Sequence, residues 1–142
     1  MKREKADSFL FNMSFWPLMK DLYDIITDPE HSMVFELDGN YVRAYKLTEN
    51  KIEKAWHIEA KEAYAILLGR DSLYIGSWGG ISRISAEDGS LLAKTEKNIY
   101  VRPGQIMNLI GDKLVVMNSM GGQALYDADT LKEVYVKTDS YR

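Results

Sequence analysis

Two segments of the 142-residue chain share the same order of apolar runs and turn residues, and this similarity constrains the fold more than any other feature. The segment 71–95 reads DSLYIGSWGGISRISAEDGSLLAKT, and the segment 112–136 reads DKLVVMNSMGGQALYDADTLKEVYV. When the two are aligned, Asp71 falls on Asp112 and Ser77 on Ser119, so the second copy gains one position between these two matches. A period of about 40 residues indicates a repeat protein in which each unit is one supersecondary structure.

Turn residues divide each repeat into four short runs that are apolar or alternate between apolar and polar residues, which is the pattern of β-strands. Similar runs precede the two repeats from residue 33 onward. Strands are predicted at residues 33–37, 41–47, 52–58, 63–68, 73–77, 81–85, 91–94, 106–110, 114–118, 123–126 and 133–136. Nine Tyr, four Phe and three Trp, together with many Val and Ile, favour strands over helices.

The N-terminal segment 1–30 has a different pattern. Alternating apolar residues predict a strand at residues 8–15, and apolar residues spaced by three and four predict a helix at residues 15–27. Ser14 is a suitable N-cap for this helix, and Asp28-Pro29 would end it. Because no strand is predicted directly before residue 33, residues 8–15 are the candidate innermost strand of the first unit, with the helix inserted in that unit.

Repeats of about 40 residues with four strands each are typical of β-propeller blades, which cover their two sheet faces by stacking on one another. The phrases LYIGSWGGISRISAEDGSLLAKT and LVVMNSMGGQALYDADTLKEVYV resemble the blades of quinoprotein-dehydrogenase-like and WD40-like propellers, and their double glycines are similar to those of kelch repeats. The resemblance implies a fold and no activity. It carries over no cofactor-binding residue of the quinoproteins, so we expect no cofactor.

We therefore predict an all-β, propeller-like array of about three four-stranded blades with one N-terminal helix. The single domain of residues 1–142 would comprise an N-terminal strand and helix at 8–30 and blades at 31–60, 61–97 and 98–137. Propellers close with about four to eight blades, so three leave two sheet faces open. A six-bladed ring of two copies, a cap formed by the helix, or further blades in a longer protein would cover these faces, and we expect the homodimer.

Composition and charge argue against several classes of function. The chain has no cysteine, and its 18 Lys and Arg against 21 Asp and Glu give a net charge of -3 without a clustered basic face. We therefore expect no nucleic-acid partner. No apolar stretch has the length of a signal peptide or a membrane span, so a cytoplasmic protein without a membrane partner is expected. His31 and His57 are interpreted as solvent-facing or packing residues, and no catalytic or metal site is predicted.

Aromatic and arginine side chains near the predicted turns are the candidate binding residues, since this combination is typical of protein interfaces and of sugar-binding sites. The candidates for binding a partner or ligand are Trp78, Arg83, Arg43, Trp56, Tyr74 and Trp16. Arg43 precedes Arg83 by about one repeat period, and we expect the two at matching positions of neighbouring blades. Trp78 is expected to be exposed in a tight turn. Asp127 and Asp129 are interpreted as turn residues rather than calcium ligands.

The function that these features favour is a non-enzymatic protein-interaction module of propeller type, which binds another protein and itself. The alternative is an oligomeric, lectin-like propeller that binds sugars through Trp78, Trp56 and Arg83. The third hypothesis is a hydrolase or lyase with its site in the central channel of the ring, for which the sequence identifies no set of catalytic carboxylates.

Overall fold

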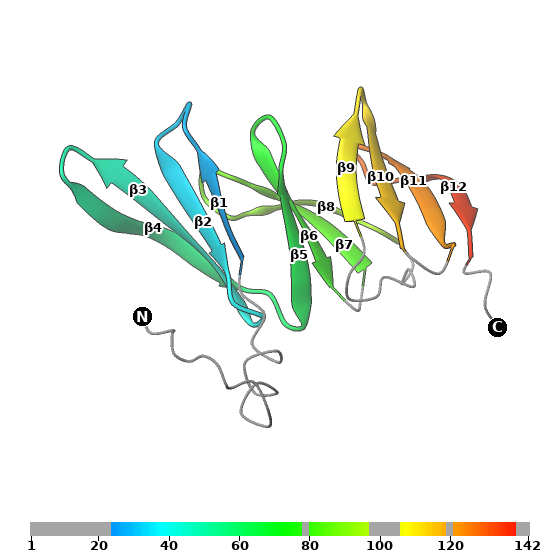
Figure 1. Ribbon diagram of the computed structural model, residues 1–142, viewed down its shortest axis with the longest axis horizontal. Coiled ribbons are helices and arrows are strands. Elements are labelled where there is room, and N and C mark those ends of the chain that lie inside the picture. Colours follow the sequence, from blue (N-terminus) through cyan, green and yellow to red (C-terminus); the bar gives the residue numbers. More distant parts are fainter. Residues whose placement is uncertain (1–23, 78–79, 97–105, 119–120, 139–142) are drawn as a thin grey trace, which may run out of the picture.

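The computed structural model describes residues 24–77, 80–96, 106–118 and 121–138 of the chain. These residues form twelve strands in three four-stranded antiparallel sheets, and no helix (Figure 1). Within each sheet, strands that follow one another in the sequence are neighbours. None of the described residues forms a helix long and apolar enough to span a membrane.

Each sheet contains the strands of one predicted blade, and the first sheet also includes β1, which precedes the predicted start of blade 1 at residue 31. Blade 1 consists of β1 (Asp24–Asp28), β2 (Met33–Leu37), β3 (Tyr41–Thr48) and β4 (Lys51–Glu59). Blade 2 consists of β5 (Ala63–Leu68), β6 (Ser72–Ser77), β7 (Gly80–Ser85) and β8 (Leu91–Lys94). Blade 3 consists of β9 (Ile106–Ile110), β10 (Lys113–Met117), β11 (Gln123–Asp127) and β12 (Glu133–Lys137). All the strands predicted from residue 33 onward are therefore present.

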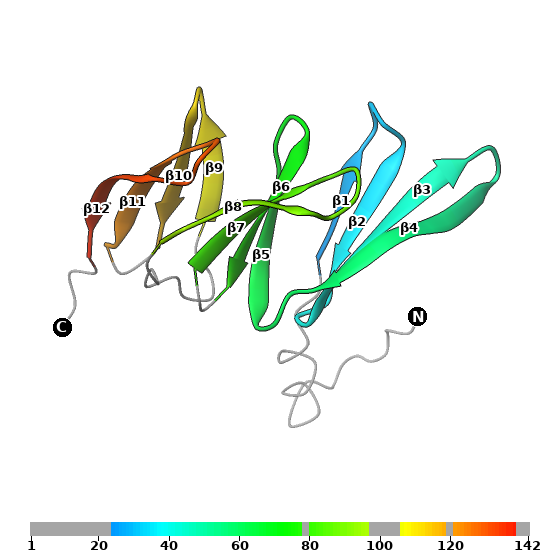
Figure 2. The ribbon, with the colours of Figure 1, turned by 180° about the vertical axis from the view of Figure 1, so that it is seen from behind.

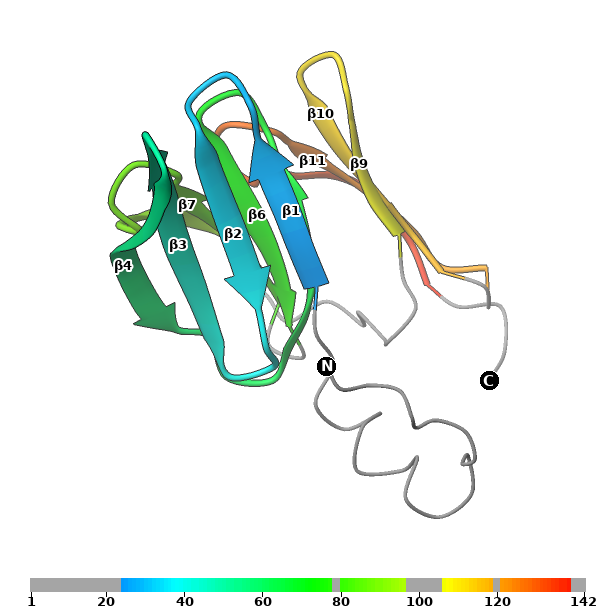
Figure 3. The same ribbon diagram turned by 60° about the vertical axis from the view of Figure 1, so that its left-hand side comes forward.

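The three blades lie side by side in sequence order (Figures 1 and 2). The first strand of each blade is the innermost one, since β5 contacts β1 of blade 1 and β9 of blade 3. The β1–β2, β5–β6 and β9–β10 turns all point to the same rim of the array (Figures 1 and 3). Loops that are far apart in the sequence therefore come together on this rim.

An apolar layer joins blades 1 and 2. Phe35 and Leu37 alternate along β2, Val42 and Ala44 alternate along β3, and all four are fully buried. They pack in one cluster with residues of blade 2, among them Ile66, Leu73, Ile75 and Ile84. The strict alternation of blade 1 thus places one of its faces against blade 2.

A second apolar layer joins blades 2 and 3. Tyr74 and Ile81 of blade 2 pack with Leu114, Val116 and Tyr126 of blade 3. On β6, Tyr74 faces blade 3, whereas its neighbours in the sequence face blade 1. The central blade is therefore covered on both faces, which explains why five of the six residues of β6 are buried.

The predicted N-terminal helix is wrong for residues 24–27, which belong to β1 and pair with β2 in antiparallel register. Residues 15–23 of that helix, and the strand predicted at 8–15, lie outside the described residues. The innermost strand of blade 1 is β1. Its Ile25-Ile26-Thr27 run is β-branched, and Ile26 packs against the core between blades 1 and 2. Pairing and burial therefore decide the structure of a segment whose apolar spacing also fits a helix.

Candidate interaction site between blades 2 and 3

A cleft of about 590 Å³ opens between blades 2 and 3 on the rim that carries the β5–β6 and β9–β10 turns. Its apolar wall is formed by Leu68, Tyr74 and Leu109. The remaining lining is mostly polar and comes from Arg83 of β7 and from three turn regions, at residues 69–72, 111–112 and 127–129. The cleft thus combines turns from two different repeats of the sequence, as is common for sites built on loops.

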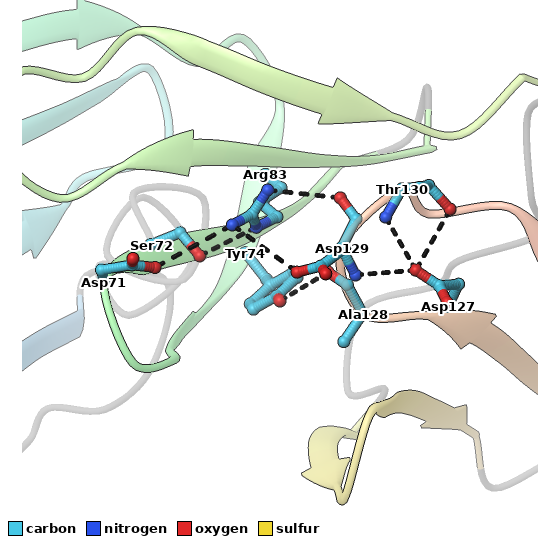
Figure 4. Close-up of polar contacts among 8 residues, drawn as sticks. All are labelled: Asp71, Ser72, Tyr74, Arg83, Asp127, Ala128, Asp129 and Thr130. Carbon is cyan, nitrogen blue, oxygen red and sulfur yellow. Dashed lines mark hydrogen bonds and ion pairs between the residues drawn. The ribbon is translucent and has the colours of Figure 1, made fainter.

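Arg83 is the central charged group of this cleft (Figure 4). Its Nε donates a hydrogen bond to Ser72 Oγ at 3.0 Å, and its Nη1 donates to the carbonyl oxygen of Asp129 at 3.2 Å. Only 18% of the side chain is exposed. The guanidinium group is therefore anchored on blade 2 and on blade 3 at once, which fixes its orientation.

Two carboxylates converge on Arg83 from opposite blades. Asp71 Oδ1 and Asp129 Oδ1 each lie 3.9 Å from Arg83 Nη2. Their side chains are 80% and 87% exposed, so these ion pairs contribute little to folding. Because both carboxylates are accessible, they remain available to donors from another molecule.

Tyr74 forms a second polar link between the blades. Its hydroxyl donates a hydrogen bond to the carbonyl oxygen of Ala128 at 2.7 Å, while its ring is buried in the apolar layer (Figure 4). The carbonyl group of Ala128 lies in the β11–β12 turn. Tyr74 and Arg83 therefore both hold this turn of blade 3 against blade 2.

The β11–β12 turn is held in shape by Asp127. Its Oδ1 accepts hydrogen bonds from the backbone N–H of Asp129 and of Thr130, both at 2.9 Å, and from Thr130 Oγ1 at 3.2 Å. The bond from the Thr130 N–H contributes most to holding the pKa of Asp127 below its usual value, and burial opposes this only partly. The interpretation of this segment as a turn is confirmed.

The structure places the other predicted binding residues elsewhere. Trp56 is half-buried between blades 1 and 2, where its Nε1 donates to the carbonyl oxygen of Ala86 at 3.1 Å. Its ring contacts Phe35, with 6.1 Å between the ring centroids. Trp56 is therefore a packing residue of the interface between these blades. Trp78 and Trp16 lie outside the described residues.

Arg43 lies on the outer face of blade 1, which faces away from blade 2. Its Nη1 is 3.4 Å from Glu36 Oε1, and the same nitrogen also donates to Asp38. The guanidinium group lies over the ring of Tyr41, 5.1 Å from the ring centroid. Arg43 and Arg83 thus contact different groups on different surfaces.

The predicted match of Arg43 with Arg83 is wrong by one position. Arg83 pairs with Tyr74, which faces the following blade, and the pair that faces the following blade in blade 1 is Ala44 with Phe35. The structural counterpart of Arg83 is therefore Ala44 and not Arg43. A shift of a single position moves a side chain to the other face of a sheet.

Both histidines are in blade 1, away from the cleft. His31 Nδ1 lies 2.9 Å from Asp28 Oδ2 in the β1–β2 turn, and this hydrogen bond raises the pKa of His31. Asp28, Glu30 and His31 bring three potential metal-ligand atoms within 4.8 Å of one another, but two of the three residues are exposed. His57 lies edge-on to Tyr41.

Sequence reasoning missed Asp71, Ser72 and Asp129 as members of the site. Asp71 has an aligned counterpart at Asp112, which also lines the cleft, so repeated turn acids are the signal that could have identified them. Their convergence on Arg83 depends on how blades 2 and 3 pack. The pattern within one repeat does not contain this information.

Comparisons with known proteins show the fold. No family model matches the chain, and no curated protein matches it. The N-terminal domain of Nup159 matches with a TM-score of 0.59 and 12% identity over 84% of this chain and 34% of that one. BamB from Moraxella catarrhalis matches with a TM-score of 0.58 and 12% identity over 78% of this chain and 35% of that one. The HIRA fragment 644–1017 matches with a TM-score of 0.54 and 14% identity over 82% of this chain and 38% of that one.

The chain spans about a third of the length of these matched structures. At such identities the likeness concerns the fold alone. Together with the three four-stranded sheets, it shows a β-propeller-like fold, present as an array of three blades that resembles part of a WD40-like propeller.

Proposed function

We propose that this chain is a non-enzymatic protein-interaction module, and that the cleft between blades 2 and 3 binds a segment of a partner protein. One observation carries the proposal: an Arg83 anchored on both blades holds the exposed carboxylates of Asp71 and Asp129 beside an apolar wall. Apolar area with a few oriented polar groups is the usual composition of a recognition site.

The charges of the cleft indicate the kind of segment that fits. Arg83 already has an oxygen acceptor on its Nε and on its Nη1, and two carboxylates lie beside its Nη2. An incoming carboxylate would therefore be repelled by Asp71 and Asp129. A segment with Lys, Arg or backbone N–H donors next to an apolar side chain would pair with these acids and cover Leu68 and Leu109.

A solved protein assembly supports a protein as the partner. The structure of S. cerevisiae Dbp5 carrying L327V, bound to Nup159 and to Gle1 H337R with IP6 and ADP, contains a chain that matches with a TM-score of 0.60 and 12% identity, over 84% of this chain and 34% of that one. The matched structure is thus an assembly of several proteins. The lectin alternative uses Trp56 as one of three sugar-binding residues. The packing of the Trp56 ring between blades 1 and 2 argues against this role.

The test compares two charge reversals in the full chain. Asp71→Lys with Asp129→Lys reverses both carboxylates of the cleft, and Glu53→Lys with Glu59→Lys reverses two exposed carboxylates of β4 as a control. Cross-linked partners are captured from the native host and quantified by mass spectrometry. We expect the cleft variant to lose a set of proteins by about tenfold or more, which corresponds to roughly 1.4 kcal/mol, and the control to retain it.

The proposal is contradicted if both variants capture the same proteins in the same amounts while circular dichroism shows both to be folded. Binding that is retained by the control should also weaken with added salt, since exposed charges are screened over about 10 Å at 0.1 M ionic strength.

A further inference from the structure

The two ends of the array present different surfaces. At one end, β2 and β3 of blade 1 expose a face that no described residue of another blade covers, and we call it the open face of blade 1. The residues at its centre pair across the two strands, Val34 with Tyr45 and Glu36 with Arg43. The Glu36 and Arg43 side chains are 17% and 30% exposed and form an ion pair.

The positions of Val34, Tyr45 and Glu36 are held by buried hydrophobic residues in the other two blades, and the position of Arg43 by the half-buried Ser82 and Ala124. The corresponding pairs are Leu73 with Ile84 and Ile75 with Ser82 in blade 2, and Leu114 with Tyr126 and Val116 with Ala124 in blade 3. In those blades this face packs against the preceding blade. In blade 1 the Glu36–Arg43 pair replaces the apolar centre, as expected for the polar outer face of a terminal repeat.

The other end of the array is apolar. The open face of blade 3 is the face that points away from blade 2, and no described residue of another blade covers it. Val115, Leu125 and Tyr135 pair in one row across β10, β11 and β12, and the exposed Asn108 of β9 continues this row. Val115 and Leu125 occupy the positions that Phe35 and Ala44 hold in blade 1, where they are fully buried. Tyr135 is 50% exposed and Met117, on the same face, is 45% exposed.

Charged residues of this face lie at the ends of the strands and not in its centre. Lys113 and Asp127 pair at one end, and Lys137 pairs with Gln123 at the other. Asp112 holds Lys113 by a hydrogen bond of 2.8 Å at the first of these ends. An apolar centre on three strands with a polar and charged border is the composition of a protein interface.

We propose that the open face of blade 3 binds the same face of a second copy of this chain, around a two-fold axis, while the open face of blade 1 stays in solvent. An isologous contact of this kind places apolar rows against each other and leaves the charged strand ends at the border. This surface is separate from the cleft between blades 2 and 3, so the inference does not rest on the function proposed above.

A closed ring of two copies would require a different contact, between blade 3 of one copy and blade 1 of the other. That contact would press Val115 and Leu125 onto the Glu36–Arg43 pair and remove its remaining water. Taking an ion pair out of water is costly for each charge and is offset only when new hydrogen bonds form. Val115 and Leu125 offer none, so the polarity of the two faces favours the isologous dimer over the ring.

Cysteine cross-linking distinguishes the two arrangements. Because the natural chain has no cysteine, a single introduced cysteine can form a disulfide only with the same cysteine of a second copy. We expect at least one of Val115→Cys, Leu125→Cys and Tyr135→Cys to form a disulfide-linked dimer under mild oxidation. The reason is that a residue near a two-fold axis lies beside its own symmetry mate, within the roughly 4.4–6.8 Å Cα separation that a disulfide requires. Ile25→Cys, on the open face of blade 1, should stay monomeric on a non-reducing gel.

Sedimentation equilibrium of the full chain provides the second measurement. Met117→Lys with Tyr135→Lys should weaken the dimer by on the order of 100-fold, since Tyr135 ends the apolar row, Met117 flanks it, and the change adds four like charges to the two-fold contact. Ile25→Lys is the matched control, because Ile25 is 51% exposed on the open face of blade 1. It should leave the dimer unchanged.

Three results would overturn the inference. A monomeric natural chain at about 100 µM would show that no self-association exists at this face. Equal weakening by Ile25→Lys, or a disulfide between mixed Val34→Cys and Val115→Cys chains without any Val115→Cys homodimer, would show the closed ring. A disulfide-linked homodimer together with the selective effect of the blade 3 variant supports the inference.

Discussion

The two interfaces between blades are built from the same repeat in different ways. Between blades 1 and 2, apolar side chains fill the centre, and Trp56 extends the packing to the β7–β8 turn, where its ring lies against Gly89. Between blades 2 and 3, the apolar centre is continued by hydrogen bonds from Tyr74 and Arg83 to the β11–β12 turn. The first interface ends in an aromatic ring and the second in polar groups.

This difference shows how a repeat protein acquires a site. A tryptophan at the edge of the first interface buries its ring and satisfies its one donor internally. At the second interface, an arginine and a tyrosine hold a turn in place while two carboxylates remain exposed beside a cleft of about 590 Å³. Both interfaces stabilise the stacking of the blades, and only the interface between blades 2 and 3 leaves oriented polar groups at the surface.

The largest expected effect comes from emptying the apolar centre of the first interface. Phe35→Ala should lower the free energy of unfolding by about 3–5 kcal/mol, since Phe35 is fully buried and its removal leaves a cavity. Urea unfolding followed by tryptophan fluorescence measures the change. If the variant is too unstable to purify, Phe35→Leu should cost less than about 1.5 kcal/mol and keeps the test open. A cost under about 1 kcal/mol for Phe35→Ala would show that blades 1 and 2 are not held by this layer.

The contact of Trp56 with Gly89 can be tested apart from backbone conformation. Gly89 has a φ of 78°, and a Cβ added there would lie 2.7 Å from Trp56 Cε3. Gly89→Ala should therefore cost roughly 2–5 kcal/mol, from the left-handed backbone and from overpacking together. Gly111→Ala is the control, because Gly111 has a φ of 62° and no atom within 4 Å of its added Cβ.

Gly111→Ala should cost only about 1–2 kcal/mol, from the backbone alone. Thermal unfolding of both variants gives the difference that belongs to the Trp56 ring. Equal losses for the two glycines would mean that the ring moves aside without cost, and that the first interface is less tightly packed than its geometry indicates.

Two tyrosines of the second interface should respond differently to loss of the hydroxyl. Tyr74→Phe removes the hydrogen bond to the Ala128 carbonyl and should cost about 1 kcal/mol. Tyr126→Phe should be neutral or stabilising, because the buried Tyr126 hydroxyl has no hydrogen-bond partner among the described residues. Burial raises the pKa of Tyr126 to about 12, in agreement with a hydroxyl kept from water.

Chemical denaturation of the two tyrosine variants under identical conditions gives the comparison. A loss for Tyr126→Phe as large as that for Tyr74→Phe would show that the Tyr126 hydroxyl is satisfied and that the polar link is not special to Tyr74.

The smallest expected effect is a dependence on pH at the β11–β12 turn. The pKa of Asp127 is lowered in the folded protein, so its contribution to stability is present above the unfolded value of 3.8 and is lost as the pH falls through the folded value. Asp127→Asn keeps an oxygen acceptor but cannot ionise. The stability difference between the natural chain and this variant should therefore shrink as the pH is lowered below about 4.

Thermal unfolding midpoints measured between pH 2 and pH 6 for both proteins test this dependence. A difference that stays constant over this range would show that ionisation of Asp127 does not stabilise the turn, and that the turn acids of the second interface differ little from any exposed carboxylate.

The strands were predictable because the relevant signals are local. Runs such as 73–77 and 114–118 are mainly apolar or alternate, and turns with Gly and Asp bound them. The apolar pattern and the turn residues together already specify strands. Residues 24–27 were not predictable in this way. Their apolar residues fit a helix spacing as well as a strand, and only the free edge of β2 and the core position of Ile26 decide between the two.

The candidate site was predictable only in its parts. Arg83 and Tyr74 were identified from their residue types, but Asp71 and Asp129 belong to different repeats and meet through the packing of two blades. Arg43 was matched with Arg83 by an alignment that is wrong by one position. Alignment of a weakly similar repeat does not determine which residues of a strand point to which face of the sheet.

By itself the sequence determined the repeat, the four strands per unit and the turns between them, since each depends on residues within a few positions of one another. Tertiary structure decided which face of each strand is covered, where Arg83 finds its partners, and that blade 1 ends in the Glu36–Arg43 pair while blade 3 ends in an apolar row. The physical reason is that burial is a property of a pair of surfaces, and a surface has no partner until the blades are stacked.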